Sequence, residues 1–260
     1  MNPISRCVAW AALTAAAGTG LGLAPGSASA QGSNVLIVLD SSGSMAGKVG
    51  NQTKMDLAER VVGDLVENMP ADMNVGLLVY GARSPRKENN CDDIELVQPM
   101  GPPDAAGISE ALRQTQPRGM TPISGSLRRA AAVLKGTEGT STIVLVSDGT
   151  ESCQGDPCQV AREVHEETGI DVKVHVVGLD VAAGERDTLA CVAEKGGGKY
   201  FAVENEQELR SALTEATAPP PAPAGCGSGP MWASLGHPGL GEMINAHQGW
   251  KGLPKMKFYL

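Results

Sequence analysis

The sequence predicts an α/β fold in which helices cover both faces of a doubly wound, mostly parallel sheet with one antiparallel edge strand. Between residues 34 and 217, short apolar runs alternate with amphipathic stretches, as strands and helices do when they follow one another along a chain. Several of these runs are continuously apolar, as expected for central strands that are covered on both faces. The region is long enough for one core that buries roughly 70% of the unfolded chain's surface. We therefore expect a single domain over residues 31–217.

The first half of this domain begins with a fully apolar strand over residues 35–39. A Gly-rich loop separates it from residues 54–69, whose apolar side chains recur at helical spacing until Pro70 ends the pattern. Residues 74–80 form the second expected strand, and residues 93–97 form a shorter third one. Because the polar segment between them is too short for a crossover helix, we expect the third strand to run antiparallel at the sheet edge.

Helices and strands continue to alternate in the second half. A short helix is expected over residues 104–114 with Asp104 as its cap, and Pro122 begins the helix that follows it. An apolar strand over residues 142–147 ends at Asp148. The remaining expected elements are helices over residues 123–134, 157–167, 185–194 and 206–216 and strands over residues 172–178 and 199–203.

The two ends of the chain differ from the domain in composition. Residues 1–30 hold one charge, Arg6, followed by an Ala/Leu/Gly-rich run with a small-residue ending, which predicts a cleaved signal peptide and a secreted or periplasmic protein. A retained membrane helix is the alternative, but it would need about 20 strongly apolar residues, and polar residues, glycines and Pro25 interrupt this run. Residues 218–260 are rich in Pro and Gly, so we expect a disordered tail; a short recognition peptide is the alternative there.

The charge of the chain restricts its partners. It carries 29 acidic and 21 basic side chains and has no basic block. Nucleic acids and anionic lipids are bound largely through Lys and Arg, so neither is an expected partner. The expected partners are proteins or small ligands.

Five of the six cysteines follow the predicted signal peptide, and in an exported chain they indicate disulfides. Four of them can pair in three ways, among which the sequence does not choose, and Cys226 in the tail is the odd one. Zinc is the alternative for the Cys-x4-Cys spacing, but no second Cys or His pair lies nearby. The four disulfide candidates are Cys91, Cys153, Cys158 and Cys191.

Oxygen-bearing side chains follow two of the apolar strands. Asp40 ends the first strand and is followed by Ser42 and Ser44, whereas Asp148 ends the strand over residues 142–147 and Thr121 lies in a Gly/Pro-framed loop. Ligands of open α/β sheets bind outside the carboxyl ends of the strands, so these five side chains should converge if the two strands are neighbours. Hard divalent cations such as Mg²⁺ prefer oxygen ligands. The pattern therefore predicts a cation site, although each residue could also serve only as a cap or turn residue.

The ordered set Asp40-x-Ser42-x-Ser44, Thr121 and Asp148 resembles the metal-ion-dependent adhesion site (MIDAS) of von Willebrand factor A (VWA) domains, in particular that of small exported bacterial members. The resemblance implies a Rossmann-like fold over residues 34–217. It also implies that both serine hydroxyls ligate Mg²⁺, or another divalent cation such as Mn²⁺ or Ca²⁺, and that Asp40 does so directly or through water. Thr121 would engage when the site is occupied, and Asp148 would hold a coordinating water. One position would remain for an Asp or Glu of a protein partner.

Enzyme motifs are incomplete in this sequence. It has no Gly-x-Ser-x-Gly, and the segment from Gly43 to Lys48 has three intervening residues where a phosphate-binding loop needs four. No His lies near the cluster in sequence to act as a general base, and Glu151 could tune the charge there without being a ligand. We therefore expect a non-catalytic binding module. A metal-assisted hydrolase and a scaffold with a vestigial metal site are the alternatives.

Overall fold

The computed structural model describes residues 32–167 and 171–219. The predicted signal peptide and all but the first two residues of the predicted tail therefore lie outside the described residues. Contacts along the chain divide it into a unit that ends at Ala218 and a unit that begins at Pro219, and every helix and strand below belongs to the first. Within the two described ranges, no helix is both long enough and apolar enough to cross a membrane.

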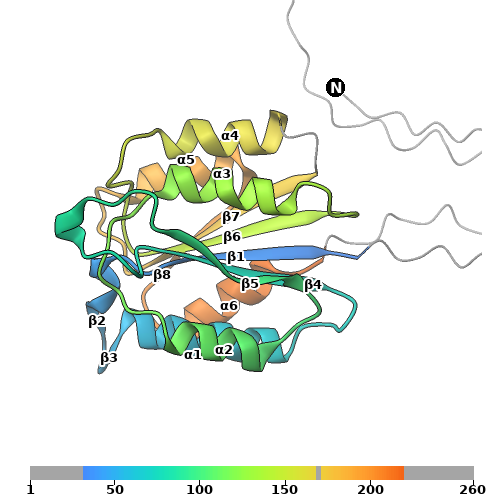
Figure 1. The fold of residues 1–260 in the computed structure, drawn as a ribbon, viewed down its shortest axis with the longest axis horizontal. Helices are drawn as coiled ribbons and strands as arrows, with labels where there is room; N and C mark the ends of the chain where they lie inside the picture. The colour runs from blue at the N-terminus through green and yellow to red at the C-terminus, as the bar shows by residue number, and fades with distance from the viewer. Residues whose placement is uncertain (1–31, 168–170, 220–260) are drawn as a thin grey trace, which may run out of the picture. The chain divides into compact units, whose positions relative to one another are not determined.

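Six strands form the central sheet in the order β5-β4-β1-β6-β7-β8 (Figure 1). They are β1 (Asn34–Asp40), β4 (Asn74–Tyr80), β5 (Ile94–Gly101), β6 (Ser141–Ser147), β7 (Val172–Leu179) and β8 (Gly197–Val203). β5 runs antiparallel to β4 at one edge, and all other neighbours are parallel. The predicted fold class, including its antiparallel edge strand, is confirmed.

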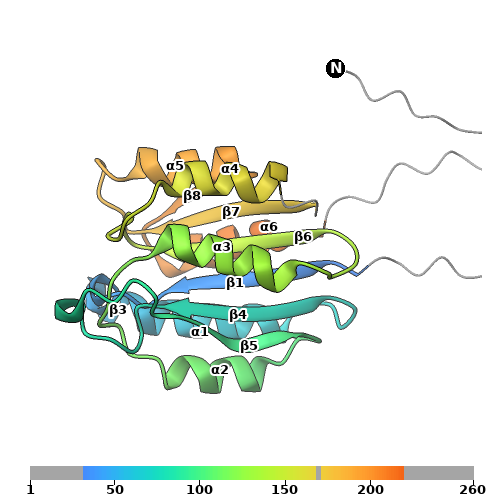
Figure 2. The ribbon, with the colours of Figure 1, turned by 45° about the horizontal axis from the view of Figure 1, so that its top comes forward.

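In the part of the chain that the structure describes, three helices cover each face of the sheet, and the two sets lie on opposite sides of it (Figures 1 and 2). On one face lie α1 (Lys54–Glu67), α2 (Ala105–Arg113) and α6 (Glu206–Ala216), and on the other lie α3 (Ile123–Leu134), α4 (Pro157–Glu167) and α5 (Arg186–Lys195). Side chains alternate between the faces of a strand: Ile37 of β1 joins the apolar cluster under α1, and Leu36 joins the cluster under α3. This explains why the central strands are continuously apolar.

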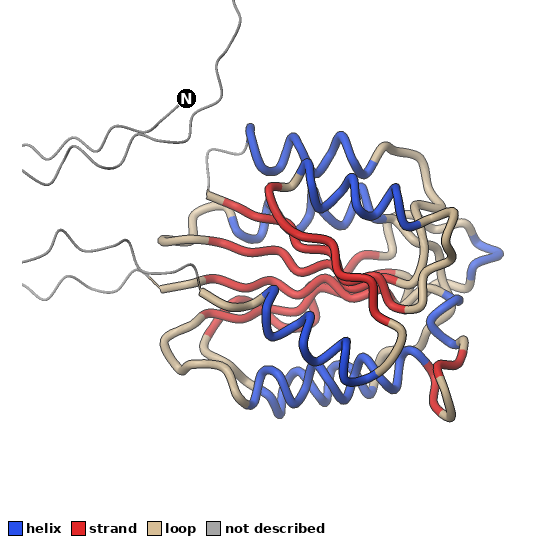
Figure 3. The backbone as a smooth tube through the Cα atoms, turned by 180° about the vertical axis from the view of Figure 1, so that it is seen from behind, coloured by secondary structure: helices blue, strands red, loops and turns tan. Residues whose placement is uncertain are grey.

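The Gly-rich loop after β1 contains structure that the sequence pattern does not predict. A 3₁₀ turn, η1 (Gly43–Ala46), is followed by a hairpin of β2 (Lys48–Val49) and β3 (Gln52–Thr53). The hairpin ends at Thr53, which caps α1 in a capping box with Asp56. A second 3₁₀ turn, η2 (Arg86–Glu88), lies between β4 and β5. Figure 3 shows the hairpin and η2 projecting from the same end of the sheet.

Two disulfides join all four candidate cysteines. Cys91 pairs with Cys153 at a Cα–Cα distance of 5.9 Å, and Cys158 pairs with Cys191 at 5.5 Å. The first bridge fastens the loop before β5 to the loop after β6, and the second joins α4 to α5. The prediction of disulfides is confirmed, and the zinc alternative is wrong because Cys153 and Cys158 belong to different bridges.

The order of the strands places a topological switch point between β1 and β6, which is called the crevice below. These strands are parallel neighbours, but the chain leaves β1 towards α1 on one face and leaves β6 towards α4 on the other. Loops that diverge in this way open the crevice where α/β sheets bind ligands. Asp40 and Asp148 stand on its two sides.

Candidate metal centre

The Asp40 side of the crevice is a buried chain of hydrogen bonds. Asp40 is fully buried, and its Oδ1 accepts a hydrogen bond of 2.7 Å from the backbone N–H of Ser42. Its Oδ2 accepts one of 2.6 Å from the hydroxyl of Ser147, which in turn accepts one of 3.2 Å from the Tyr80 hydroxyl. Both carboxylate oxygens are thus oriented by donors that carry no charge.

These surroundings compensate the charge of Asp40 only in part. Burial, followed by the nearby charge of Asp148, raises the pKa of Asp40 to about 6, although the hydrogen bonds from Ser147 and Ser42 act in the opposite direction. Burial also raises the pKa of Tyr80 well above its usual value, so its hydroxyl stays protonated and can donate. A cation beside Asp40 would favour its charged form.

Ser42 and Ser44 connect Asp40 to the other side of the crevice. Their hydroxyl oxygens lie 2.9 Å apart, and the Ser44 hydroxyl donates a hydrogen bond of 2.7 Å to Oδ1 of Asp148. Ser42 is buried, whereas Ser44 is exposed. Four of the five predicted site residues therefore form one connected network, which reaches solvent at Ser44.

Thr121 reaches the same edge of the sheet through its backbone. Gly119 forms an isolated parallel bridge with Ser42, and its N–H donates a hydrogen bond of 2.8 Å to the carbonyl of Gly81. A side chain on Gly119 would lie within 2.7 Å of the Gly81 backbone, so only glycine permits this approach. Thr121 is buried, and its N–H donates to the Ser152 hydroxyl at 2.7 Å. Among the described hydrogen bonds, none joins the Thr121 hydroxyl to the other four residues.

Lys54, which the sequence analysis did not single out, forms an ion pair with the centre. Its Nζ lies 3.1 Å from Oδ2 of Asp148, the oxygen that Ser44 does not use, and 3.2 Å from a carboxylate oxygen of Asp180. The Lys54 side chain is 11% exposed and that of Asp148 is 1% exposed, so the pair is almost completely shielded from water. Lys54 is also the first residue of α1, where a positive charge opposes the helix dipole. In the sequence, this unfavourable position of a lysine at the start of a helix is the local signal that could have indicated its ion pair with Asp148.

Glu151 has a structural role beside the centre. One of its carboxylate oxygens accepts a hydrogen bond of 2.7 Å from the backbone of Ser124 in the first turn of α3, and the other accepts one of 2.9 Å from the backbone of Cys153. Glu151 thus caps α3, whose own preceding residue, Pro122, provides no side-chain cap. Together with Ser152, it fastens the loop after β6 to the segment that carries Thr121, and the Cys91–Cys153 bridge fastens the same loop to the loop before β5.

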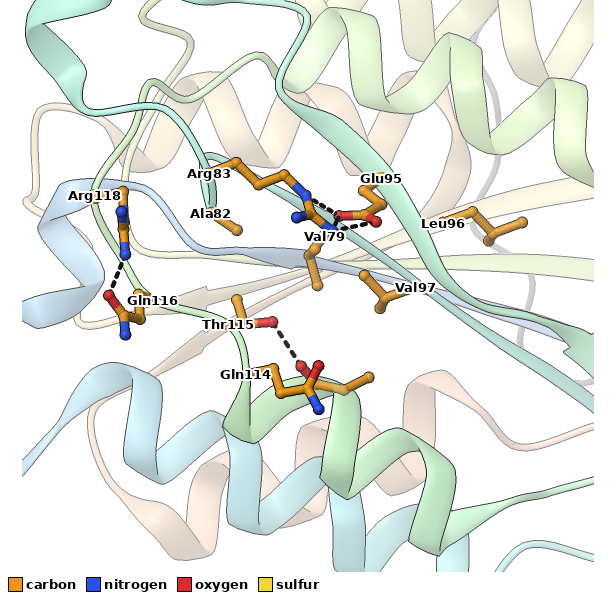
Figure 4. A pocket seen from close by; sticks show the side chains of 11 residues that line it. Val79, Ala82, Arg83, Glu95, Leu96, Val97, Gln114, Thr115, Gln116 and Arg118 are labelled. Carbon is orange, nitrogen blue, oxygen red and sulfur yellow. Dashed lines mark hydrogen bonds and ion pairs between the residues drawn. The ribbon is translucent and has the colours of Figure 1, made fainter.

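A hollow of about 450 Å³ lies next to these loops (Figure 4). Residues of β4, β5 and α2 line it, and Arg83 and Glu95 form an ion pair at its rim. Arg118 also lines it, and the backbone N–H of Arg118 donates to the carbonyl of Ser41 at 3.2 Å. The hollow therefore adjoins the loop that contains Ser42 without including any of the five predicted site residues.

The donors that converge here fit a hard divalent cation. They are two carboxylates and two hydroxyls, with a third hydroxyl on the neighbouring segment, and all of them are oxygens. Within residues 32–167 and 171–219, no group of three or more His, Cys, Asp or Glu side chains is placed to hold a metal. A site of this kind would therefore depend on serine hydroxyls.

Comparisons with known proteins agree with this architecture. Residues 35–151 match a family model described as the von Willebrand factor type A domain. Two proteins of Bacillus subtilis strain 168 are similar: YwmC is 27% identical over 188 residues (70% of this chain and 82% of YwmC), and YwmD is 29% identical over 187 residues (69% and 82%). Both carry the description "uncharacterized protein".

Solved structures with the same fold include three of different origin. An aerotolerance-related membrane protein from Bacteroides fragilis has a TM-score of 0.56 at 21% identity, over 72% of this chain and 98% of that one. The minor pilin PilB of Streptococcus sanguinis has a TM-score of 0.57 at 18% identity, over 71% and 60%. Proximal thread matrix protein 1 of the mussel byssus, described with a zinc-occupied MIDAS motif, has a TM-score of 0.55 at 18% identity, over 72% and 45%. At these identities the likeness establishes the fold alone.

Proposed function

We propose that this chain, whose fold and family-model match support a von Willebrand factor type A domain, is an exported protein-binding module that captures an acidic side chain of its partner through a divalent cation at a MIDAS. The observation that carries the proposal is a row of three side-chain oxygens. The hydroxyl oxygens of Ser42 and Ser44 lie 2.9 Å apart, and the Ser44 hydroxyl oxygen lies 2.7 Å from Oδ1 of Asp148. It lies at the carboxyl ends of β1 and β6 and reaches solvent at Ser44, so a partner can approach it.

The roles of the residues follow from their positions. The hydroxyls of Ser42 and Ser44 would hold the cation, with Mg²⁺ the first candidate and Mn²⁺, Ca²⁺ and Zn²⁺ as alternatives. Asp40 would supply negative charge directly or through water, and Asp148 would orient a water with the oxygen that now accepts from Ser44. Thr121 would engage from the adjoining loop. When bound, the cation attracts a carboxylate, because ligation mainly by neutral hydroxyls leaves most of its charge uncompensated.

We propose that the module has no catalytic activity. Asp40 is fully buried, and each of its oxygens already accepts a hydrogen bond, from Ser42 or Ser147. A carboxylate held in this way is poorly placed to take a proton from a substrate. The sequence also lacks the motifs of a nucleophile elbow or a phosphate-binding loop.

Export to an oxidising compartment is part of the proposal. The two disulfides support it, since such bonds persist outside the reducing cytosol. The predicted signal peptide points the same way. Pilus and membrane-associated proteins with the same fold are consistent with a surface or periplasmic partner.

The ion pair of Lys54 with Asp148 favours a second candidate, a scaffold whose metal site is vestigial. In this candidate, the Lys54 ammonium compensates the negative charge of Asp148 permanently, so that no metal cation is needed there. The two candidates differ in one measurable property, the affinity for Mg²⁺.

Isothermal titration with Mg²⁺ tests the proposal directly. We expect saturable binding to the wild type and at least a tenfold loss of affinity in Asp40→Ala. Asp72→Ala is the matched control, since it removes the same charge from an exposed residue before β4, at the opposite end of the sheet. No binding to the wild type would exclude the metal-dependent proposal and leave the scaffold.

A pull-down from the exported fraction tests the function. The wild type should retain a partner in Mg²⁺ and release it in EDTA, Asp40→Ala should not retain it, and Asp72→Ala should behave as the wild type. Capture that is indifferent to EDTA would contradict a metal bridge. Turnover of ester or phosphoester substrates in Mg²⁺ would contradict the non-catalytic assignment.

A further inference from the structure

Lys54 places a fixed positive charge against the carboxylate that closes the candidate metal centre. Oδ1 of Asp148 accepts a hydrogen bond from Ser44, and Oδ2 receives the ammonium of Lys54 at 3.1 Å. A single carboxylate therefore separates the serine hydroxyls from the ammonium. Because the lysine side chain is only 11% exposed, water screens this charge weakly.

A second element holds the ammonium in place. The carbonyl oxygen of Asp180, in the loop after β7, lies 3.3 Å from Nζ of Lys54, and the Asp180 carboxylate lies 3.2 Å from it. Asp180 has φ +51°, the left-handed conformation that non-glycine residues seldom adopt. Asp180 thus offers the ammonium two acceptors, so the ammonium of Lys54 is held between the loops that follow β6 and β7.

We propose that Lys54 is a resident counter-cation of the metal centre, which stabilises Asp148 when no metal is bound and weakens the affinity for a divalent cation. The inference rests on the proposed function, because it concerns the affinity of that same centre. It makes Lys54 a positioning residue that acts through Asp148 and ligates nothing itself. Asp180 then has the opposite effect, because its negative charge offsets part of the lysine charge.

Replacing Lys54 has two opposing effects on the affinity for a divalent cation. Loss of its positive charge should raise the affinity, whereas loss of its contact with Asp148 leaves that carboxylate less well oriented and should lower it. Removing the ammonium removes its repulsion of a dication, and Coulomb repulsion between a single and a double positive charge a few ångströms apart is worth about tenfold in affinity even at the dielectric constant of water. Removing it also frees one oxygen of Asp148, but the other oxygen keeps its hydrogen bond from Ser44. The repulsion is the larger effect, so the affinity should rise.

The test is calorimetric titration of the purified, disulfide-bonded protein with Mg²⁺ alone. We expect Lys54→Met to bind Mg²⁺ at least tenfold more tightly than the wild type and Asp180→Asn to bind it about threefold more weakly. Asn tolerates the left-handed conformation, so the second variant changes charge without straining the backbone. Lys199→Met is the matched control: it removes the same charge and breaks an exposed ion pair with Glu215, and its affinity should not change.

Thermal unfolding keeps the test decisive if Lys54→Met folds poorly without metal. Its Tm should fall in EDTA, where Asp148 loses its counter-charge, and Mg²⁺ should raise its Tm by more than that of the wild type. Weaker Mg²⁺ binding by both Lys54→Met and Asp180→Asn would overturn the inference, since this is the result of structural damage. If the wild type binds Mg²⁺ and Lys54→Met binds it with the same affinity, the inference about Lys54 is overturned and the proposed function stands. If neither the wild type nor any variant binds Mg²⁺, the proposed function itself is overturned.

Discussion

Asp40 and Asp148 end neighbouring strands and are both buried, but their charges are compensated in different ways. Among the described residues, Asp148 has a lysine within 3.1 Å, whereas Asp40 has only hydroxyl and backbone N–H donors, and its pKa rises to about 6. Residues 32–167 and 171–219 thus supply a counter-charge to Asp148 and none to Asp40. In the proposed metal centre, Asp40 is therefore the carboxylate whose charge an external cation would compensate most.

The same contrast applies to the loops that carry the two residues. The loop after β6 is fastened by the Cys91–Cys153 bridge, by Glu151 and by Ser152, whereas the loop after β1 is held by backbone hydrogen bonds such as that from Gly43 to Gly119. The Asp148 side is therefore held by a disulfide and by side-chain contacts and has a counter-charge, whereas the Asp40 side is held mainly by backbone hydrogen bonds.

Replacing Asp148 should have the largest effect on stability. Asp148→Ala leaves the Lys54 ammonium buried with only the half-exposed Asp180 as its partner, and breaking a buried pair in this way costs about 3 to 5 kcal/mol. Urea unfolding in EDTA at pH 7 measures the free energy of unfolding. Asp180→Asn is the matched control: it removes the charge of the more exposed partner of the same lysine without straining the left-handed backbone at this position, and it should cost less than about 1 kcal/mol. Equal losses in the two variants would contradict the comparison.

Removing the Cys91–Cys153 bridge should lower the free energy of unfolding slightly less than Asp148→Ala does. It should affect only the Asp148 side of the centre. The bridge spans 62 residues, and loss of a disulfide of this kind lowers the free energy of unfolding by about 3 kcal/mol. We expect the double variant Cys91→Ala/Cys153→Ala to bind Mg²⁺ several-fold more weakly as well, because the loop after β6, which follows Asp148 and holds Thr121 through Ser152, is then less restrained.

The second bridge provides the control for this prediction. Cys158→Ala/Cys191→Ala should lose similar stability, since that bridge spans 33 residues, but should keep its Mg²⁺ affinity because it joins α4 to α5. Equal Mg²⁺ affinities in the two double variants would show that the fastened loop does not matter for the centre.

Replacing Asp40 should change stability in the opposite direction. A carboxyl whose pKa rises from 3.8 in the unfolded chain to about 6 in the native state opposes folding by about 3 kcal/mol at pH 7. Asp40→Asn removes this opposition but weakens the hydrogen bonds from Ser42 and Ser147, at a cost of about 1 kcal/mol. We expect a net gain of about 2 kcal/mol in the free energy of unfolding in EDTA at pH 7. Mg²⁺ should stabilise the wild type and not the variant.

The pH dependence tests the cause of that gain. Between pH 4 and pH 6, the native state holds the proton of Asp40 more tightly than the unfolded chain does, so the contribution of Asp40 to stability falls as the pH rises through this window. Other groups titrate in both proteins, so the quantity to measure is the difference between wild type and Asp40→Asn. That difference should grow from pH 4 to pH 7, and a constant difference would exclude the raised pKa as its cause.

Much of the fold could be predicted from local patterns. Apolar runs with clear stops locate β1 and β4 within one residue, and proline signals locate the starts of α3 and α4. The hairpin of β2 and β3 was missed because strands of two residues are shorter than any periodic pattern. The cysteine pairing depends on which loops and helices are neighbours, and no local pattern contains that information.

The candidate site could be predicted in part for the same reason. Asp40, Ser42, Ser44 and Asp148 meet because the carboxyl ends of parallel strands share one edge of the sheet, which the strand pattern already implies. The pair formed by Lys54 and Asp148 joins residues 94 positions apart. Such a contact is set by how α1 packs against the sheet, so it becomes visible only in the folded structure.

The smallest predicted effect concerns the Asp40 side alone. Tyr80 donates a hydrogen bond to Ser147, whose hydroxyl donates to Asp40. Tyr80→Phe keeps the buried ring and removes only that first donor, so the free energy of unfolding should fall by about 1 kcal/mol. The Ser147 hydroxyl then loses the donor that polarises it and binds Asp40 less strongly, so the Mg²⁺ affinity should change by no more than a few-fold. Asp148 is linked to Asp40 through Ser42 and Ser44, but no hydrogen bond among the described residues joins it to Tyr80 or Ser147, so a Tyr80→Phe/Asp148→Ala double-mutant cycle should be additive within about 0.5 kcal/mol. A larger coupling energy would mean that the two sides of the crevice are not independent, and the contrast between them would have to be abandoned.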